Sequence, residues 1–345
     1  MMINDANLRQ FFTALNLSFN KALTNAQSYY RDVAMIVPSA SSVEAYAWLT
    51  NTPGFREWVG SRVINRLGSR RFDIVNKTWE STISIGRNDI EDDRLGIYAP
   101  LIQNMGVAAA SHPDELIFAL LAEGLVKPCY DGETFFSTQH PVGGDGAAAP
   151  VLVSNMFGSG KCAPWFLLDC SRPIRPLIFQ TRRPVEFTAK TELTSGNVFY
   201  ENEYVFGASA RYNAGFGLWQ LAYACTDPLT PYNYAVVRAA MMSQKSDAGR
   251  PLGIKPTHLV TTPGNENSAL RLLRSQTIEA TTNEWANTAE PIITQFLLGA
   301  SNAQPSWGEI SDFLSPDMTY GTGLATTADG KPPTMAATTT AGTGS

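Results

Sequence analysis

The sequence predicts an α+β protein, because helical patterns and strand-like runs occupy largely separate stretches of the chain. Residues 88–124 carry one apolar stripe at alternating steps of three and four, which is typical of a helix. Strand-like runs punctuated by proline and glycine gather between residues 165 and 225. Two further helical patterns follow, at residues 230–247 and 265–275.

An amphipathic helix is predicted first, over residues 4–27. The segment after it contains Pro38 and Pro53 and is rich in serine and threonine, so we expect it to be extended and irregular. An apolar helix on such a tether docks either on its own domain or on a neighbouring subunit. The apolar side chains, mostly on one side of this helix, are Leu8, Phe11, Phe12, Leu15, Phe19 and Leu23.

A short helix and a β-hairpin are predicted next. Residues 57–71 form the helix and include four arginines. The runs RFDIVN and TWESTISIG both have strand character, and Asn76-Lys77 lies between them at the expected turn. A lone two-stranded ribbon is marginally stable in water. The hairpin therefore packs either on its own sheet or on another chain.

The long helix is expected to begin near a group of acidic residues and to end at Gly124, with Pro128 beyond it. Its length would be roughly 45 to 50 Å, more than a compact enzyme usually needs. Pro113 inside the pattern predicts a bend at His112, or a break into two helices with Ser111 capping the second. The stripe comprises Leu95, Tyr98, Ile102, Met105, Ala109, His112, Leu116 and Leu120.

The strand-like runs after this helix are WFLLD, PLIFQ, VEFTA, NVFYENEYVFGASARY and FGLWQLAYAC. Thr230 then caps a helix with Pro231 at its first position, and Tyr234, Val237 and Met241 form its buried stripe. The final segment, ADGKPPTMAATTTAGTGS, is of low complexity, and we expect it to be disordered.

Composition excludes several classes of protein. With 345 residues, 44% of them hydrophobic, the chain can form a sizeable core and more than one domain. No apolar run reaches membrane-spanning length and no signal peptide is indicated, so we expect a cytoplasmic protein. Four scattered cysteines suit a reducing compartment. A formal charge of −5 gives no general attraction to nucleic acid.

A search for chemistry finds no metal site, cofactor site or catalytic group. His112, His140 and His258 are not at ligand spacing from one another. The acids at residues 89–93 lack the glycine and distal glutamate of a calcium-binding loop, which favours helix capping. GSGK at residues 158–161 is not a phosphate loop, because Asn155 and Cys162 stand where glycine and serine or threonine are required. We therefore expect no enzyme.

Three long stretches resemble the major head subunit of Mu-like phages and prophages, the gpT family. They are WLTNTPGFREWVGSRVINRL, NKTWESTISIGRNDIEDDRLGIYAPLIQNMGVAAASHPDELIFALLAEG and CYDGETFFSTQHPV. WFLLDCSRPIRPLIFQTRRP, NAGFGLWQLAY and LTPYNYAVVRAAMMSQKSDAGRPLGIKPTHLVTTP continue the resemblance in order, so that it covers most of residues 35–300.

The resemblance implies the Hong Kong 97 capsid fold, with an N-terminal arm, an extended hairpin called the E-loop, a peripheral domain with a long spine helix, and an axial domain. On this chain we expect the arm at residues 1–56 and the E-loop region at 57–91, with its hairpin at 70–86. The peripheral domain would cover residues 92–228, the axial domain 229–310 and a flexible tail 311–345. In many capsids of this fold the peripheral sheet comes last, whereas here the strand-rich block precedes the axial-like helices.

The implied function is that of a major capsid protein that self-assembles into an icosahedral shell around packaged double-stranded DNA. The implied partners are further copies of the chain in hexamers and pentamers, a scaffold or protease, a portal, decoration proteins, and DNA held non-specifically on the inner face. The protein would be part of the virion, assembled in the host cytoplasm, with no membrane contact. Two rivals are an encapsulin-like compartment with protein cargo and a hydrolase or ligand-binding domain.

Three sets of assembly contacts are expected. Asn76, Lys77 and Trp79, at the E-loop tip, would lie over an adjacent subunit. The arm helix would dock on a neighbour, and an arginine pair would make a salt contact between subunits or with the genome. Lys77 lies in the region where some shells of this fold form an isopeptide crosslink, but no partner stands out, so no crosslinking is predicted. The arm residues are Phe11, Phe12 and Phe19, and the arginines are Arg182 and Arg183.

Overall fold

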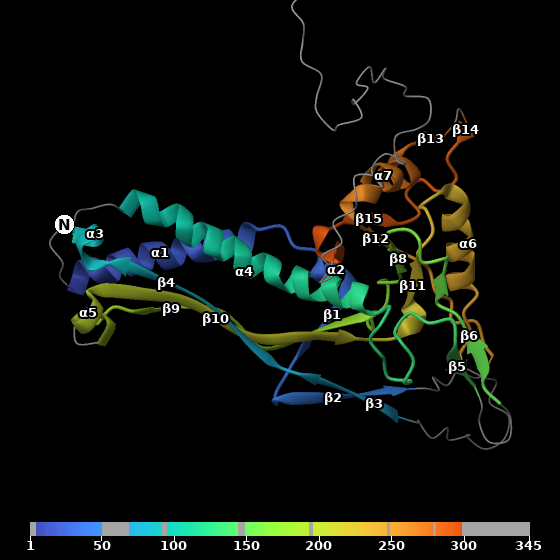
Figure 1. Ribbon diagram of the computed structural model, residues 1–345, viewed down its shortest axis with the longest axis horizontal. Helices are drawn as coiled ribbons and strands as arrows, with labels where there is room; N and C mark the ends of the chain where they lie inside the picture. The colour runs from blue at the N-terminus through green and yellow to red at the C-terminus, as the bar shows by residue number, and fades with distance from the viewer. Residues whose placement is uncertain are drawn as a thin grey trace, which may run out of the picture. The chain divides into compact units, whose positions relative to one another are not determined.

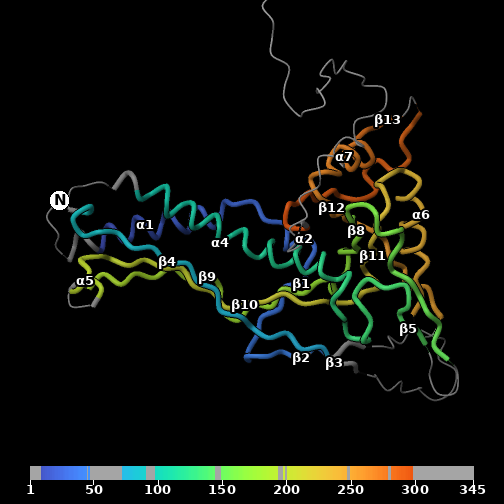
Figure 2. The backbone as a smooth tube through the Cα atoms, viewed as in Figure 1, coloured from blue at the N-terminus to red at the C-terminus, as the bar shows by residue number. Residues whose placement is uncertain are grey.

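The computed structural model describes residues 5–49, 69–91, 95–143, 149–192, 196–246, 249–278 and 281–298 (Figure 1). Residues 57–68 of the predicted arginine-bearing helix and the whole predicted C-terminal tail lie outside these ranges. The described part is mixed α and β, as predicted. Its strands form two main sheets, which Figure 2 traces together with the helices that cover them. No helix in the described ranges is both long and apolar enough to cross a membrane.

The first sheet has four strands in the order β1-β9-β10-β4. β10 pairs antiparallel with both β9 and β4, and β1 pairs parallel with β9. Every second side chain of β10 from Tyr204 to Tyr212 is buried, as expected of a strand with one face on a core. The strand bounds are β1 Ala34–Pro38, β4 Lys77–Gly86, β9 Leu177–Lys190 and β10 Glu203–Phe216.

The predicted long helix is present as α4, Leu95–Glu123, and a short helix, α3, Arg87–Glu91, precedes it. α4 continues through Pro113, so the expected break into two helices is wrong. Ser111 does not cap a helix, because its hydroxyl donates to the carbonyl oxygen of Ala108 at 3.1 Å. The buried side chains of α4 include Ile102, Met105, Ile117, Phe118 and Leu121, and they pack toward the first sheet.

The predicted arm helix is α1, Asp5–Asn25, and it lies alongside α4 (Figure 1). Gly106 of α4 allows the close approach, since an added Cβ atom would lie 2.6 Å from the carbonyl oxygen of Phe19. Phe11 packs edge-on against Phe206, while Phe12 and Phe19 stack on Phe187. The aromatic residues of this helix are therefore packed on the first sheet of their own chain, and docking of the helix on a neighbouring subunit stays a prediction.

The second sheet has five strands in the order β15-β12-β8-β11-β7. β8 and β11 are buried on both faces, which is typical of a central strand. Because these two strands and β7 precede residue 229, the expected boundary at residues 228/229 passes through one sheet. The strand bounds are β7 Met156–Phe157, β8 Trp165–Leu168, β11 Ala222–Cys225, β12 His258–Thr261 and β15 Glu290–Ile293.

Helices α6, Pro231–Met242, and α7, Glu266–Arg274, share one hydrophobic core with the second sheet. α6 confirms its prediction in detail. The hydroxyl of Thr230 accepts from the backbone N–H of Asn233 at 3.2 Å, and Tyr234, Val237 and Met241 are fully buried. The smaller elements are α2 Tyr30–Val33, β5 His140–Val142, β6 Val151–Val153, α5 Gly196–Glu201, β13 Thr277–Ile278, β14 Thr281–Thr282 and the 3₁₀ turns Trp219–Leu221, Pro263–Asn265 and Gln295–Leu298.

The predicted hairpin over residues 70–86 does not form. β3, Ser69–Val75, pairs antiparallel with β2, Val43–Leu49, in a separate two-stranded ribbon, whereas β4 pairs with β10 along its whole length. Pairing with β10 gives β4 ten partner residues and buries Ile85 in the core beneath α1 and α4. These non-local contacts outweigh the local hairpin signal.

Candidate functional site

Asn76 lies at the junction of the β2–β3 ribbon with the first sheet and not at a loop tip. It is 7% exposed. Its side-chain amide donates to Ser39 Oγ and to the Ser41 carbonyl oxygen, both at 2.9 Å. Its Oδ1 accepts from Gln180 Nε2 at 2.9 Å. The structure therefore corrects its expected position: Asn76 anchors the ribbon to its own chain.

Trp79 is also held by its own chain. The indole N–H donates to the carbonyl oxygen of Tyr212 at 3.1 Å, and the ring lies 4.4 Å from that of His112 on α4. Lys77, two residues earlier, is exposed at the first position of β4, opposite Tyr212. Trp79 thus ties β4 to α4 and does not form a loop tip.

Burial lowers the pKa of His112 below its ordinary value of 6.5, although nearby Glu115 acts in the opposite direction. His112 Nδ1 lies 2.8 Å from the Tyr212 hydroxyl.

This lowered pKa makes the stability of the fold depend on pH. Below about pH 6.5 His112 binds a proton in the unfolded chain but not in the folded one, so protonation favours unfolding and the fold loses stability as the pH falls toward the folded-state pKa. We expect the free energy of unfolding to decrease from about pH 7.5 to about pH 5.5, and His112→Gln to reduce the slope. The free energies of unfolding of the unaltered chain and of His112→Gln are measured by urea unfolding at both pH values. An equal decrease with pH in the two proteins would contradict the prediction.

Arg182 and Arg183 are exposed on β9, where the pairing with β10 is irregular. Arg182 Nη1 donates to the carbonyl oxygen of Ser39 at 3.1 Å. Arg183 donates to Ser209 Oγ at 3.1 Å and lies 4.0 Å from the Glu186 carboxylate. These weak contacts leave both guanidinium groups accessible, and their role in assembly stays a prediction.

The β2–β3 ribbon is a separate two-stranded sheet (Figure 1). Its base is held on the first sheet by polar contacts and by the buried Ile74, which packs against Ile178 of β9. The Tyr46 hydroxyl donates to Gln180 Oε1 at 2.8 Å, and burial, with a smaller effect of Glu44, raises the pKa of Tyr46 to about 12. Within the described residues, β2 and β3 pair only with each other, so the outer edge of each strand is unpaired. Unpaired edges can pair with another chain.

Asp114 joins the arm to α4. Its carboxylate accepts from the backbone N–H groups of Tyr29 and Tyr30 and from the Ser28 hydroxyl, at 2.6 to 3.0 Å. Burial raises the pKa of Asp114, although these donors act against the rise. The contact places the start of α2 on α4.

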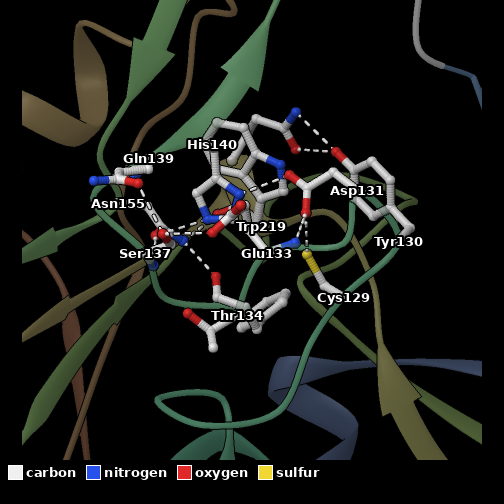
Figure 3. Close-up of polar contacts among 12 residues, drawn as sticks. Cys129, Tyr130, Asp131, Glu133, Thr134, Ser137, Gln139, His140, Asn155 and Trp219 are labelled. Atoms are coloured by element: carbon white, nitrogen blue, oxygen red, sulfur yellow. Dashed lines mark hydrogen bonds and ion pairs between the residues drawn. The ribbon is translucent and has the colours of Figure 1, made fainter.

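A buried polar cluster lies in the connection between α4 and β5, and sequence reasoning missed it (Figure 3). His140 Nδ1 is 2.7 Å from Asp131 Oδ2, and the Cys129 thiol donates to Asp131 Oδ1 at 3.0 Å. Burial opposes ionisation of Asp131, but hydrogen bonds from His140 and Cys129 outweigh it and lower the pKa. Burial raises the pKa of the Cys129 thiol. The side chains of His140 and Asp131 are 0% and 2% exposed, so the cluster offers no surface to a substrate.

Comparison with known proteins identifies the family. The model of the Mu-like prophage major head subunit gpT matches residues 8–297. The chain belongs to this gpT family. It is 43% identical over 280 residues to the major capsid protein of Escherichia phage Mu, a match covering 80% of this chain and 92% of that protein. It is 36% identical over 274 residues to the FluMu major head subunit of Haemophilus influenzae, covering 78% and 89%.

Solved structures of a phage capsid protein agree with the fold. The procapsid subunit of bacteriophage JBD30 matches with a TM-score of 0.76 and 41% identity, covering 86% of this chain and all of that one. The JBD30 capsid matches with a TM-score of 0.70 and 31% identity, covering 86% and 100%. The chain therefore has the phage capsid fold that its sequence implied, and the gpT family is one of structural capsid subunits.

Proposed function

We propose that this chain is the repeating subunit of a closed icosahedral shell that encloses packaged double-stranded DNA. The observation that supports this most strongly is the match to a complete procapsid subunit at 41% identity. The first sheet with α1 and α4 would be the peripheral domain, and the second sheet with α6 and α7 the axial domain. Many weak copies of one heterologous contact would close such a shell.

The β2–β3 ribbon is the proposed E-loop, in place of residues 70–86. It is a two-stranded unit with unpaired outer edges, joined to the rest of the chain at Asn76 and Tyr46. Because a two-stranded ribbon alone is marginally stable, its far part gains stability when it lies on a second subunit. The far part of the ribbon would therefore act in assembly, whereas its base belongs to the fold of its own chain.

Shortening this ribbon is expected to abolish shell formation without unfolding the subunit. Ala47 pairs with Arg71, so residues 48–70 can be replaced by Asn-Gly, which closes a two-residue hairpin. The anchoring residues Tyr46, Ile74 and Asn76 remain. The measurement is negative-stain electron microscopy and size-exclusion chromatography of the protein expressed with its neighbouring genes.

The control is the melting curve of the unassembled subunit, which is expected to be unchanged by the shortening. Shells of normal size from the shortened chain would contradict the ribbon proposal. If the unaltered chain forms no particles with its neighbouring genes, the shell proposal itself fails. The two outcomes are therefore distinguishable.

Arg182 and Arg183 remain the proposed basic contact, either with an adjacent subunit or with DNA on the inner face. A net charge of −5 would keep the overall attraction to DNA weak, which suits packing and release. A structure of the assembled shell with both guanidinium groups in bulk solvent would contradict this role.

Further partners are proposed by analogy. One solved JBD30 capsid, 30% identical with a TM-score of 0.67, is described as decorated with minor capsid protein trimers, and it covers 80% of this chain and 92% of that one. We propose that the outer surface here also accepts a decoration protein, and that a scaffold or protease and a portal take part in assembly in the host cytoplasm. Affinity purification of assembling particles followed by mass spectrometry tests these partners; particles containing only this chain would exclude them.

A further inference from the structure

Three side chains of metal-ligating type converge in the connection between α4 and β5. The ligand atoms of Cys129, Asp131 and His140 all lie within 4.8 Å of one another (Figure 3). The residues come from one short stretch of chain, in which the Cys129 N–H donates to the Glu133 carbonyl oxygen at 2.8 Å. Sulfur, nitrogen and carboxylate oxygen together are the donor set that zinc uses in proteins.

The orientation of His140 is fixed by Asn155, which is fully buried. The Asn155 amide nitrogen donates to the carbonyl oxygens of Phe135, Trp219 and Ala222, at 2.8, 3.3 and 3.3 Å. Its Oδ1 must therefore be the atom that faces His140 Nε2 at 3.1 Å, so Nε2 carries a proton. Nδ1 is then the ring nitrogen that can present a lone pair to the cluster.

This is the arrangement found around metal-binding histidines, which donate the second ring N–H to an oxygen of a neighbouring group. The imidazole also stacks on Trp219, with ring centres 3.9 Å apart and planes inclined by 6°. The ring is therefore held in place before any ion binds, and little rotamer freedom is lost on binding.

The charges also balance. A thiolate from Cys129, a carboxylate from Asp131 and a neutral imidazole sum to −2, which one divalent cation neutralises in a buried site. Binding releases the thiol proton and the proton shared between His140 and Asp131, so both hydrogen bonds give way to bonds to the ion. The atoms joined by those bonds are 3.0 and 2.7 Å apart. Ligands around one tetrahedral zinc are separated by roughly 3.3 to 3.8 Å, so these two pairs need to move apart by less than about 1 Å. The thiol of Cys129 and the ring of His140, within 4.8 Å of each other, need to approach by about 1 Å at most.

We propose that Cys129, Asp131 and His140 bind a zinc ion that ties the α4–β5 connection to the start of β5. With three protein ligands, a fourth position is left for water or a nearby carboxylate such as that of Glu133. The ion would be structural, because the surrounding side chains are buried.

The test is the metal content of the full-length chain, purified without a metal-binding tag from cells supplied with zinc. We expect roughly one zinc ion per chain by mass spectrometry. Cys129→Ser is expected to lose the ion, whereas Cys162→Ser, a change at an exposed cysteine, keeps it. Equal metal content in the unaltered chain and in Cys129→Ser would overturn the proposal.

A spectroscopic test does not depend on the folding of any variant. Chain produced with cobalt in place of zinc is expected to show a thiolate-to-cobalt charge-transfer band in the near ultraviolet, and the band should remain in Cys162→Ser. Bound cobalt without that band would show that the thiol is not a ligand. In that case the cluster is a purely hydrogen-bonded one and the proposal fails.

Discussion

Asn155→Leu is expected to lower the free energy of unfolding by about 3 to 5 kcal/mol, because several buried partners lose their hydrogen bonds together. The Ser137 N–H and the Phe135 carbonyl oxygen, at 2.9 and 2.8 Å, lose their bonds to Asn155, and His140 loses the oxygen opposite Nε2. The leucine side chain has the same number of heavy atoms in the same branched arrangement and leaves no cavity, so the effect does not come from lost volume.

Urea unfolding of the unassembled chain checks this prediction. The matched control is Asn267→Leu, at an exposed position on α7, where the change is expected to stay within about 0.5 kcal/mol. If both variants unfold at the same urea concentration, the polar centre around Asn155 does not support the fold as described.

Phe19→Ala is expected to destabilise the unassembled subunit by about 3 to 5 kcal/mol, the usual cost of removing a buried phenylalanine. Phe19 is fully buried between α4 and the first sheet, and its ring lies 4.8 Å from that of Phe187. Since these contacts are within one chain, the loss appears before any assembly.

The experiment distinguishes an arm helix that packs on its own chain from one that docks on a neighbouring subunit. The melting temperature is measured on dilute, unassembled protein, and Leu17→Ala, on the same helix but 70% exposed, is the control. A Phe19→Ala subunit that melts normally but assembles poorly would instead place the helix on a neighbouring subunit.

Elements with strong local signals were predicted well from sequence. α6 has its cap, its N-terminal proline and its buried stripe where the pattern put them, and α4 lies within the predicted range. The break into two helices expected at Pro113 does not occur, because packing of the surrounding turns outweighs the loss of one hydrogen bond.

The sequence predicted a hairpin over residues 70–86 in place of the β2–β3 ribbon, because two strand-like runs flank Asn76-Lys77 as they would in a hairpin. The true partners, β2 and β10, are distant along the chain, and single-sequence patterns carry little information on such pairing.

The cluster of Cys129, Asp131 and His140 was missed for a similar reason. Its three ligand types are mixed, and the residue that orients the histidine, Asn155, lies 15 positions beyond His140.

β8 and β11 contribute alternate side chains to two hydrophobic cores, one beneath α4 and one beneath α6 and α7. A displacement in either core is therefore transmitted along the same strands to the other, and the two halves should lose structure in one cooperative step.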